Sequence, residues 1–505
     1  MKNVLEYLEH SASLHPEKIA AEDQEKSCSY RELLSNARQI GSFLSDFEPP
    51  GSPVVVFMDK NVEALTAFMG IVYAGCFYVL INPGQPAARL RQILKVLNPG
   101  SAVTLGNTKA LLEDAGFSGN LFDYHEAVKS EIKEESLNLI RKLSLDIDPL
   151  YCNFTSGSTG VPKGVLVSHR SVIDFMEYFP SMFGITGEDI IGNQAPFDFD
   201  VSVKDIYSTL KTGATMVIIP KKLFSIPTEL LDYLCERKVT TLIWAVSALC
   251  LITQLKGFTY KVPSRVNKVL FSGEAMPVKH LTTWQEHLPD ARYVNLYGPT
   301  EITCNCTCYP VDRKFEAHET LPIGKAFPNE KVFLLDQDDK LVTEKGQVGE
   351  ICVSGTALAL GYYNNLEQTK RAFVQNPLNT RYLETIYRTG DLAFYQEHGE
   401  LCFAGRKDFQ IKHMGHRIEL EEIEAILNSY PLIERACCVF DEEKSRITAF
   451  YVGAMEGKEI SIRMRESLPV YMIPSAFCPL RELPVTANGK LDRKKLLEMG
   501  KGKQP

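Results

Sequence analysis

The 505-residue sequence lacks any apolar run approaching the roughly 20 residues that a membrane-spanning helix needs. Its longest apolar stretches, such as MVIIP and VVVF, have the length of buried strands. The N-terminal stretch MKNVLEYLEHSASLHPEKIAAEDQEKS carries glutamates where a secretory signal peptide has an uninterrupted apolar core. These absences argue against membrane insertion and against secretion.

A basic surplus is also missing, since 55 Lys and Arg residues stand against 63 Asp and Glu residues, for a net charge of −8. A nucleic-acid-binding protein usually shows a basic surplus or stripe, so this class is disfavoured. Thirteen cysteines without a secretion signal are expected to be free thiols in a reducing compartment. The expected location is therefore cytoplasmic.

Short apolar runs alternate with helical patterns over about the first 400 residues, which predicts an α/β fold with largely parallel sheets. An amphipathic helix is expected from residue 30, because Ser29 and Glu32 have the spacing of a capping box. The predicted strands are 53–59, 77–82, 215–220, 240–246, 266–272 and 292–297.

The pattern changes after about residue 320, where short strands alternate with Gly- and Asp-containing turns and predict a β-rich subdomain. Beyond GRKD (405–408), a helical segment ending at Pro431 and the strand-like runs ACCVF and RITAFYVG predict a small α+β unit. We therefore place the domain boundary after Ala404, between a large domain (1–404) and a small C-terminal lid domain (405–505).

The stretch TSGSTGVPKG (155–164) combines glycines, hydroxyl side chains and a lysine, as expected of a loop that holds phosphate. It is not a Walker A loop, because Pro162 stands where the second glycine belongs and Gly164 follows Lys163 in place of Ser or Thr. A flexible Gly/Ser linker is disfavoured by the strand-like residues on both sides. Phosphate binding is predicted, but this loop alone leaves the reaction open.

Four further motifs follow in order: NLYGPTE (295–301), YRTGD (387–391), GRKDFQIKHMGHRIELEEIE (405–424) and PVTANGKLDR (484–493). With the loop, they resemble the ordered signatures of the adenylate-forming superfamily of acyl-CoA synthetases, luciferases and peptide-synthetase adenylation domains. FDFDVSV (197–203), GCFYVLINPGQPAAR (75–89) and LPVYMIP (468–474) resemble its amino-acid-activating branch, notably D-alanine–carrier protein ligases and stand-alone adenylation domains.

The resemblance implies two half-reactions, in which ATP first converts a carboxylate into an acyl-adenylate and a thiol then attacks that anhydride. It implies that Glu301 holds Mg²⁺, that Thr300 contacts the α-phosphate and that Lys490 is catalytic, bridging the carboxylate and the α-phosphate. Read alone, the motif around Tyr297 could be a core aromatic followed by a plain turn, and Asp391 and Arg406 could each belong to an ordinary surface salt bridge. The remaining ATP-binding positions implied by the family are Thr155, Ser156, Thr159, Lys163, Gly273, Glu274, Asn295, Tyr297, Asp391 and Arg406.

The substrate's α-ammonium is expected to bind Asp200, because a buried carboxylate needs a cationic partner. The alternative is that Asp198 or Asp205 is the relevant carboxylate and Asp200 only caps a helix. Lys204 would favour an anionic or polar substrate side chain if it points inward, and would be an ordinary surface lysine if it points outward. By motif alignment, the other walls of the pocket are Val201, Leu270, Ser272, Leu296, Cys304 and Asn305.

The segment CNCTC (304–308) could present cysteines to a soft metal, but the C-x₂₋₄-C pairing of zinc sites is missing, and buried thiols are expected. The resemblance further implies rotation of the small domain about Asp408 between the two half-reactions. No LGG-x-S motif follows the ANGKLDR stretch, so the thiol is expected from a phosphopantetheine carrier protein in another chain. The alternatives are a CoA ligase of a small carboxylic acid and a catalytically silent scaffold protein.

Overall fold

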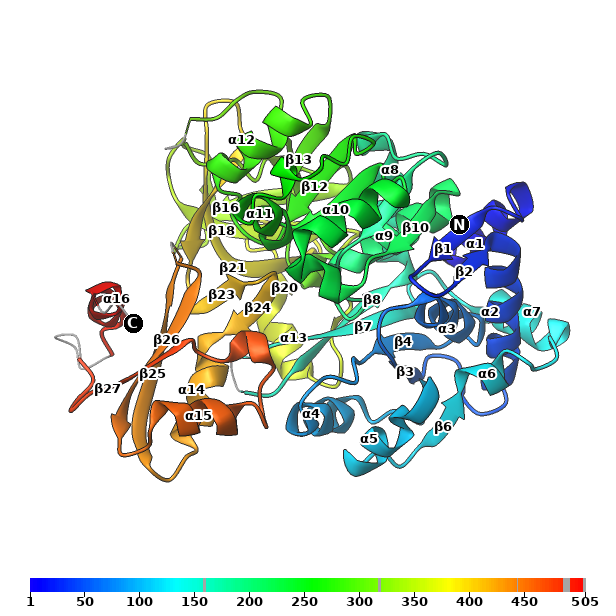
Figure 1. Ribbon diagram of the computed structural model, residues 1–505, viewed down its shortest axis with the longest axis horizontal. Coiled ribbons are helices and arrows are strands. Elements are labelled where there is room, and N and C mark those ends of the chain that lie inside the picture. The colour runs from blue at the N-terminus through cyan, green and yellow to red at the C-terminus, as the bar shows by residue number, and fades with distance from the viewer. Residues whose placement is uncertain (158–159, 317–318, 443, 485–490, 503–505) are drawn as a thin grey trace.

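The protein is described by a computed structural model, which covers residues 1–157, 160–316, 319–442, 444–484 and 491–502 (Figure 1). Two large sheets, each mostly parallel, form the first two-thirds of the chain. Among the described residues, no helix is both long and apolar enough to cross a membrane.

The nine-stranded sheet has the order β15-β14-β13-β12-β11-β9-β10-β1-β2, with parallel pairing from β13 to β1. Its strands are β1 (Ile19–Glu22), β2 (Ser27–Ser29), β9 (Ile190–Asn193), β10 (Thr215–Ile218), β11 (Thr241–Ala245), β12 (Lys268–Ser272), β13 (Arg292–Tyr297), β14 (Thr307–Pro310) and β15 (Lys325–Ala326).

The seven-stranded sheet has the order β19-β8-β7-β4-β3-β5-β6 and is parallel from β7 to β6. Its strands are β3 (Pro53–Phe57), β4 (Phe77–Leu80), β5 (Ser101–Thr104), β6 (Asn120–Asp123), β7 (Pro149–Thr155), β8 (Lys163–Ser168) and β19 (Gly361–Tyr362). Between residues 1 and 300 the helices are α1 (Leu5–Leu14), α2 (Tyr30–Leu44), α3 (Val62–Tyr73), α4 (Ala87–Leu97), α5 (Lys109–Asp114), α6 (Tyr124–Ala127), α7 (Glu134–Leu143), α8 (His169–Phe183), α9 (Val201–Thr212), α10 (Pro227–Glu236), α11 (Val246–Gln254) and α12 (Val278–His287), with 3₁₀ turns η1 (Gly106–Thr108), η2 (Lys221–Ser225) and η3 (Gly257–Thr259).

A third, antiparallel sheet follows, and the small domain carries a hairpin, a three-stranded sheet and its own apolar core. The third sheet contains β16 (Glu330–Leu335), β17 (Leu341–Val342), β18 (Gly349–Gly355), β20 (Phe373–Gln375), β21 (Thr385–Tyr395) and β22 (Leu401–Arg406). The small domain contains β23 (Gln410–His413), β24 (His416–Glu419), β25 (Ile433–Asp441), β26 (Arg446–Gly453), β27 (Ala476–Pro479), α14 (Leu420–Asn428), α15 (Gly457–Met464), α16 (Arg493–Gly502) and η5 (Val470–Met472); η4 (Thr300–Ile302) and α13 (Leu366–Ala372) precede it.

The α/β prediction is confirmed. All six predicted strands are present, β13 with the predicted bounds and the other five with slightly shorter ones. Helix α2 begins with the expected capping box, in which Ser29 accepts from the Glu32 amide. The strands were predictable because they are buried along nearly their whole length and read as continuous apolar runs, and α2 was predictable because its buried residues recur at the helical period. The predicted boundary after Ala404 lies inside β22, which continues to Arg406; the division at that residue stays a prediction.

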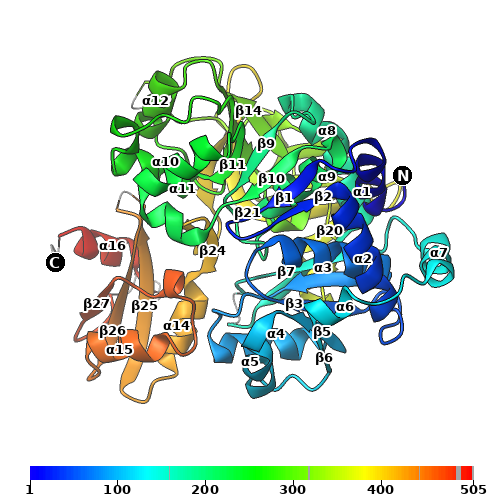
Figure 2. The same cartoon turned by 45° about the vertical axis from the view of Figure 1, so that its right-hand side comes forward.

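The largest apolar cluster joins α1, α2, α3, α8 and α9 with strands of both large sheets, so these helices lie between the sheets. Figure 2 shows the small domain beside the large one, with β24 and α14 facing it and α16 on the far side. Parallel strands present their carboxyl ends at one edge of a sheet, which is where ligands of α/β proteins bind. The loops after β12 and β13, and the hairpin β23–β24, meet there.

Candidate active site

The phosphate-loop candidate connects β7 to β8 as an antiparallel hairpin in which Thr155 pairs with Lys163. The small domain covers it: Ser156 Oγ donates to the backbone oxygen of Arg417 at 2.8 Å, and Lys163 Nζ lies 3.7 Å from Glu419 Oε1. Burial and the Arg417 charge lower the pKa of Lys163 to about 8, although Glu301 and Glu419 oppose the shift. Thr155 Oγ1 is buried without a hydrogen-bond partner among the described residues.

Glu301, the predicted Mg²⁺ ligand, lies fully buried in η4. Arg417 Nη1 donates to both of its carboxylate oxygens, at 2.9 and 2.8 Å, and Tyr362 Oη donates to Oε1 at 2.7 Å. Burial alone would raise the pKa of Glu301, but Arg417 and Lys163 outweigh it and lower the pKa to about 2. The carboxylate is therefore held ionised, as a cation ligand must be.

The predicted nucleotide residues form a hydrogen-bonded group. Tyr297 Oη donates to Asp391, and Arg406 Nη1 donates to the other oxygen of the same carboxylate. The side chain of Asn295 donates to the backbone oxygen of Pro322 at 2.8 Å. These contacts join β13 of the nine-stranded sheet to β21 and β22 of the third sheet, so the predicted nucleotide residues of two sheets lie beside one another.

Gly273 and Glu274 follow the carboxyl end of β12. Gly273 has φ of +99°, a left-handed conformation that glycine adopts without strain, and it turns the chain away from the strand. Glu274 then accepts from the backbone N–H of Gly415 in the small domain at 2.8 Å. The predicted hinge residue, Asp408, accepts from Arg406 Nε at 2.6 Å and Nη2 at 2.8 Å.

Asp200 stands at the N-cap position of α9, but its side chain makes no capping hydrogen bond. Burial raises its pKa, while the Thr300 hydroxyl and the charges of Lys204 and Lys412 act in the opposite direction. Of the alternatives, Asp205 is fully buried and accepts from Asn193 Nδ2 at 2.6 Å, an internal contact. Asp200 is thus close to the predicted Thr300 without serving as a helix cap.

Lys204 points inward and is fully buried. Its Nζ donates to Asn305 Oδ1 at 2.7 Å and to Ser272 Oγ at 3.3 Å. Among the other predicted walls, Leu270, Leu296 and Cys304 are buried, and Cys304 Sγ lies 3.0 Å from the backbone oxygen of Asp200. Val201 is only half-buried, in the first turn of α9.

The backbone next to these walls is strained. Thr303 and Cys304 are consecutive non-glycine residues with φ of +51° and +77°. Such conformations cost free energy and persist only where surrounding contacts maintain them. Here Thr303 Oγ1 donates to the backbone oxygen of Ala357 at 2.7 Å, which fixes the turn that directs Cys304 and Asn305 toward Lys204.

Sequence reasoning did not single out several residues that the small domain and its neighbours bring to the site. Arg417 binds Glu301, and Lys412 Nζ lies 5.5 Å from the centre of the Tyr297 ring. His416 stacks on Tyr471 with ring centres 3.5 Å apart and meets Phe199 edge-on at 4.5 Å. The newly found residues all belong to the motifs quoted for the resemblance: Arg417, Lys412, His416, Tyr471 and Phe199. Their contacts cross domain and motif boundaries, which no local pattern reveals.

Two predicted residues, Thr159 and Lys490, lie outside the described part of the chain. The segments that flank Lys490 pack within the small domain, where Leu483, Leu491 and Leu496 join a cluster with Cys437 and Phe450. Arg493 Nη1 donates to Glu424 Oε1 at 2.6 Å. Figure 1 places α16, which begins at Arg493, on the side of the small domain away from the large one.

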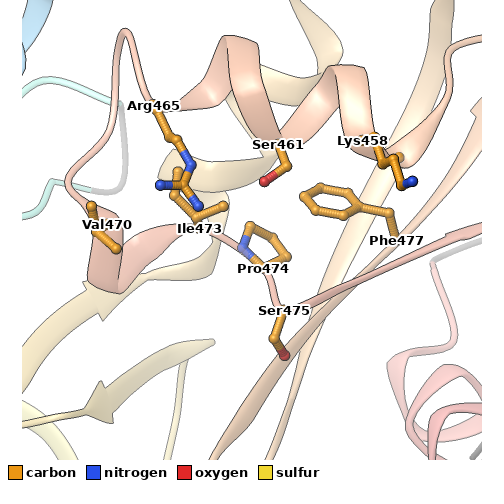
Figure 3. Close-up of a pocket in the computed structure, with 9 residues that line it drawn as sticks. Lys458, Ser461, Arg465, Val470, Ile473, Pro474, Ser475 and Phe477 are labelled. Carbon is orange, nitrogen blue, oxygen red and sulfur yellow. The ribbon is translucent and has the colours of Figure 1, made fainter. Parts of the chain in front are cut away.

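Two other features lie apart from this group. The thiols of CNCTC are buried, and no cluster of three or more His, Cys, Asp or Glu side chains suited to a metal exists among the described residues. A hollow in the small domain lies between α15, η5 and β27, and Figure 3 shows Ser461 and Phe477 facing it. None of the predicted site residues lines that hollow.

Comparison with known proteins places this geometry in a family. The family described as AMP-binding enzyme matches residues 8–363, and its C-terminal domain matches residues 422–490. Zwittermicin A synthase ZmaJ of Bacillus cereus is 32% identical over 97% of this chain and 93% of that protein. Tyrocidine synthase 1 of Brevibacillus parabrevis is 31% identical over 98% of this chain, which spans only 45% of that protein.

Solved structures agree with these relatives. Holo-PA1221, described as a nonribosomal peptide synthetase (NRPS) protein containing adenylation and PCP domains, aligns with a TM-score of 0.82 and 26% identity. The alignment covers 99% of this chain and 84% of that one. The family matches include the β7–β8 loop and the motifs after β12 and β13 in the large domain and reach residues 422–490 of the small domain, while the hairpin β23–β24 lies between the two matched regions. The chain therefore belongs to the AMP-binding enzyme family, the adenylate-forming family that includes the NRPS adenylation domains.

Proposed function

We propose that this enzyme activates an amino acid as its aminoacyl-adenylate, releasing pyrophosphate, and then transfers the aminoacyl group to the phosphopantetheine thiol of a carrier protein. The position of Asp200 is the observation that supports an amino acid as the substrate. It is a carboxylate at the carboxyl edge of the nine-stranded sheet, and its side chain forms no helix cap. Burial penalises its charge, and a substrate α-ammonium would supply the missing partner.

The first half-reaction brings a carboxylate anion to a polyphosphate, so it needs cationic and dipolar groups around the phosphates. Lys163, the hydroxyls of Thr155 and Ser156, and the amides of the β7–β8 loop supply them. Thr155 Oγ1 is a buried hydroxyl whose missing partner a phosphate oxygen could provide. Asp391, with Arg406 and Tyr297, is the polar group suited to the ribose and adenine.

Mg²⁺ fits Glu301, because this carboxylate is buried and its pKa is lowered to about 2. When bound, the ion would neutralise part of the phosphate charge. Arg417 now donates to both oxygens of Glu301, so the hairpin β23–β24 must withdraw before the carboxylate can serve a metal. We infer that the described arrangement is not the one that forms the adenylate.

The position of the small domain supports the same inference. Leu491 and Arg493, close to Lys490 in sequence, pack against the outer part of the small domain. In the arrangement that forms the adenylate, Lys490 is proposed to bridge the substrate carboxylate and the α-phosphate. The hairpin then returns for thiol transfer, when Lys412 and Arg417 lie beside the positions proposed for the adenylate.

The finer resemblance to D-alanine–carrier protein ligases is not part of this proposal. A methyl side chain would leave the buried ammonium of Lys204 with neutral partners only. The carrier-protein acceptor is favoured because the aligned structure of holo-PA1221 is described as containing a PCP domain beside its adenylation domain.

ATP–pyrophosphate exchange against a panel of L- and D-amino acids, each paired with its deaminated analogue, tests the proposal. We expect exchange with one amino acid and a loss of at least tenfold with the deaminated twin, because Asp200 would lose its partner. In Asp200→Asn, exchange with the amino acid should fall toward that of the twin. Exchange that requires no amine, followed by transfer to CoA, would identify a CoA ligase and contradict the proposal.

A further inference from the structure

Lys204 is a buried cation that forms no ion pair with any of the described residues. Its two hydrogen-bond partners, Asn305 Oδ1 and Ser272 Oγ, are neutral. Among the described residues, no carboxylate oxygen lies within the 4.0 Å of an ion pair from its Nζ. Burying an ammonium without a counter-charge is costly, so a residue of this kind usually pairs with an anion or binds one.

Neither of the nearest acidic residues forms an ion pair with Lys204. Asp205 is adjacent in sequence, and one of its carboxylate oxygens accepts from Asn193 while the other has no hydrogen-bond partner among the described residues. Asp200 is the residue proposed to bind the substrate ammonium; burial raises its pKa, and the charges of Lys204 and Lys412 both act to lower it. Burial lowers the pKa of Lys204 despite the opposing charges of Asp200 and Asp205, so the nearby carboxylates do not offset the cost of burying it.

The surroundings of Lys204 indicate a ligand-binding site, not a position in the packed core. Ser272 ends β12, and Asn305 follows the strained turn at Thr303 and Cys304, so both lie at the ligand-binding edge of the sheet. An ammonium has three N–H donors, and these two neutral acceptors engage two of them. The third remains available to an incoming acceptor, and Leu296 and Cys304 provide apolar walls for a short aliphatic stem.

Asp200 and Lys204 also have a suitable spacing. They are four residues apart at the start of α9, an axial separation of about 6 Å at 1.5 Å per residue. A short amino acid with a carboxylate at each end of its carbon chain can reach both, with its ammonium on Asp200 and its side-chain carboxylate toward Lys204.

We propose that the activated amino acid has an anionic side chain, and that Lys204, oriented by Asn305 and Ser272, is the residue that selects it. This inference rests on the proposed amino-acid activation and specifies its substrate class. The α-carboxylate, which reacts with ATP, stays free of Lys204 because the side-chain carboxylate binds there.

The test uses ATP–pyrophosphate exchange by the full chain with both enantiomers of aspartate and glutamate, with asparagine and glutamine, and with alanine and leucine. Succinate and glutarate serve as deaminated controls. We expect the preferred acidic amino acid to exceed its amide by at least tenfold, since an amide supplies no charge to the ammonium. This comparison needs no variant, so it holds whether or not substitutions at Lys204 fold.

Lys204→Met keeps the length of the side chain and removes its charge. We expect it to lower kcat/KM for the acidic amino acid by about 10²-fold and to abolish the preference over the amide. Lys222→Met, the same change at an exposed lysine, should leave both values unchanged. If Lys204→Met kept the wild-type preference for the acidic amino acid over its amide, the inference would be overturned.

The outcomes separate the two levels of the proposal. Wild-type exchange led by a neutral amino acid would overturn the anionic side chain and leave amino-acid activation intact. Exchange with succinate or glutarate equal to that with the amino acid would overturn amino-acid activation. Lys204 would then bind one carboxylate of a dicarboxylic acid that has no amine. Absence of exchange with every acid tested would contradict the proposed function, and this inference would fall with it.

Discussion

The two ends of the site are built in different ways. At the substrate end, Lys204, Ser272 and Asn305 come from one domain and are joined by hydrogen bonds of 3.3 and 2.7 Å. At the phosphate end, the β7–β8 loop and Glu301 of the large domain meet Arg417 and Glu419 of the small domain through ionic contacts. The first end is preformed by the sheet, while the second exists only while the domains keep this arrangement.

The difference follows from what each end must do. A pocket that selects one side chain benefits from groups held in place before binding. A phosphate site that serves two successive reactions benefits from contacts that can separate, and ion pairs between domains can exchange partners with ATP and its metal. If this comparison is correct, substitutions in the two ends and at the domain junction should affect different half-reactions.

Lys490→Ala has the largest expected effect. It should lower the rate of adenylate formation by about 10³-fold, because it removes the cation proposed to bridge the carboxylate and the α-phosphate. Pyrophosphate exchange measures this step. Thiol transfer from a chemically prepared adenylate and substrate binding should largely survive. Lys494→Ala, at an exposed position of α16, is the control, and near-normal exchange by the Lys490 variant would contradict the role.

Asp408→Pro should come next, slowing thiol transfer by about 10²-fold while sparing exchange, because proline restricts the backbone at the proposed hinge. Among the hydrogen bonds of the described residues, none is donated by the Asp408 N–H, so proline removes no such bond. Asp408→Ala, which removes only the carboxylate contacts with Arg406, is the matched comparison. Equal losses in both half-reactions would remove the support for a hinge.

The smallest effect is expected at the buried ion pair between Arg89 of α4 and Glu422 of α14, whose atoms lie 2.8 Å apart. Arg89→Gln or Glu422→Gln should leave the remaining charge buried and disfavour the described arrangement. Thiol transfer should fall by about tenfold with exchange preserved, while the charge swap Arg89→Glu with Glu422→Arg restores transfer. A fall in Tm with no change in the ratio of the two half-reactions would indicate a purely structural contact.

Much of the fold was predictable from the sequence because its signals are local. The capping box at Ser29 and Glu32 and the continuous apolar runs of β3, β11 and β13 depend on neighbouring residues only. The motifs placed Glu301, Tyr297 and Asp391 in one site, and the structure brings them together through Arg417 and Arg406. The role of Lys490 and the boundary after Ala404 stay predictions.

The sequence by itself determined the elements, the family and the set of chemical groups, because periodicity and motif spacing are encoded along the chain. Only the tertiary structure decided that Lys204 points inward, that Asp200 forms no helix cap and that Arg417 binds Glu301. The surroundings of Lys204 and the Arg417–Glu301 contact depend on residues more than 60 positions apart, such as Lys204 with Ser272, whose separation is 68. Burial and charge pairing arise when distant segments pack, and no local pattern contains that information.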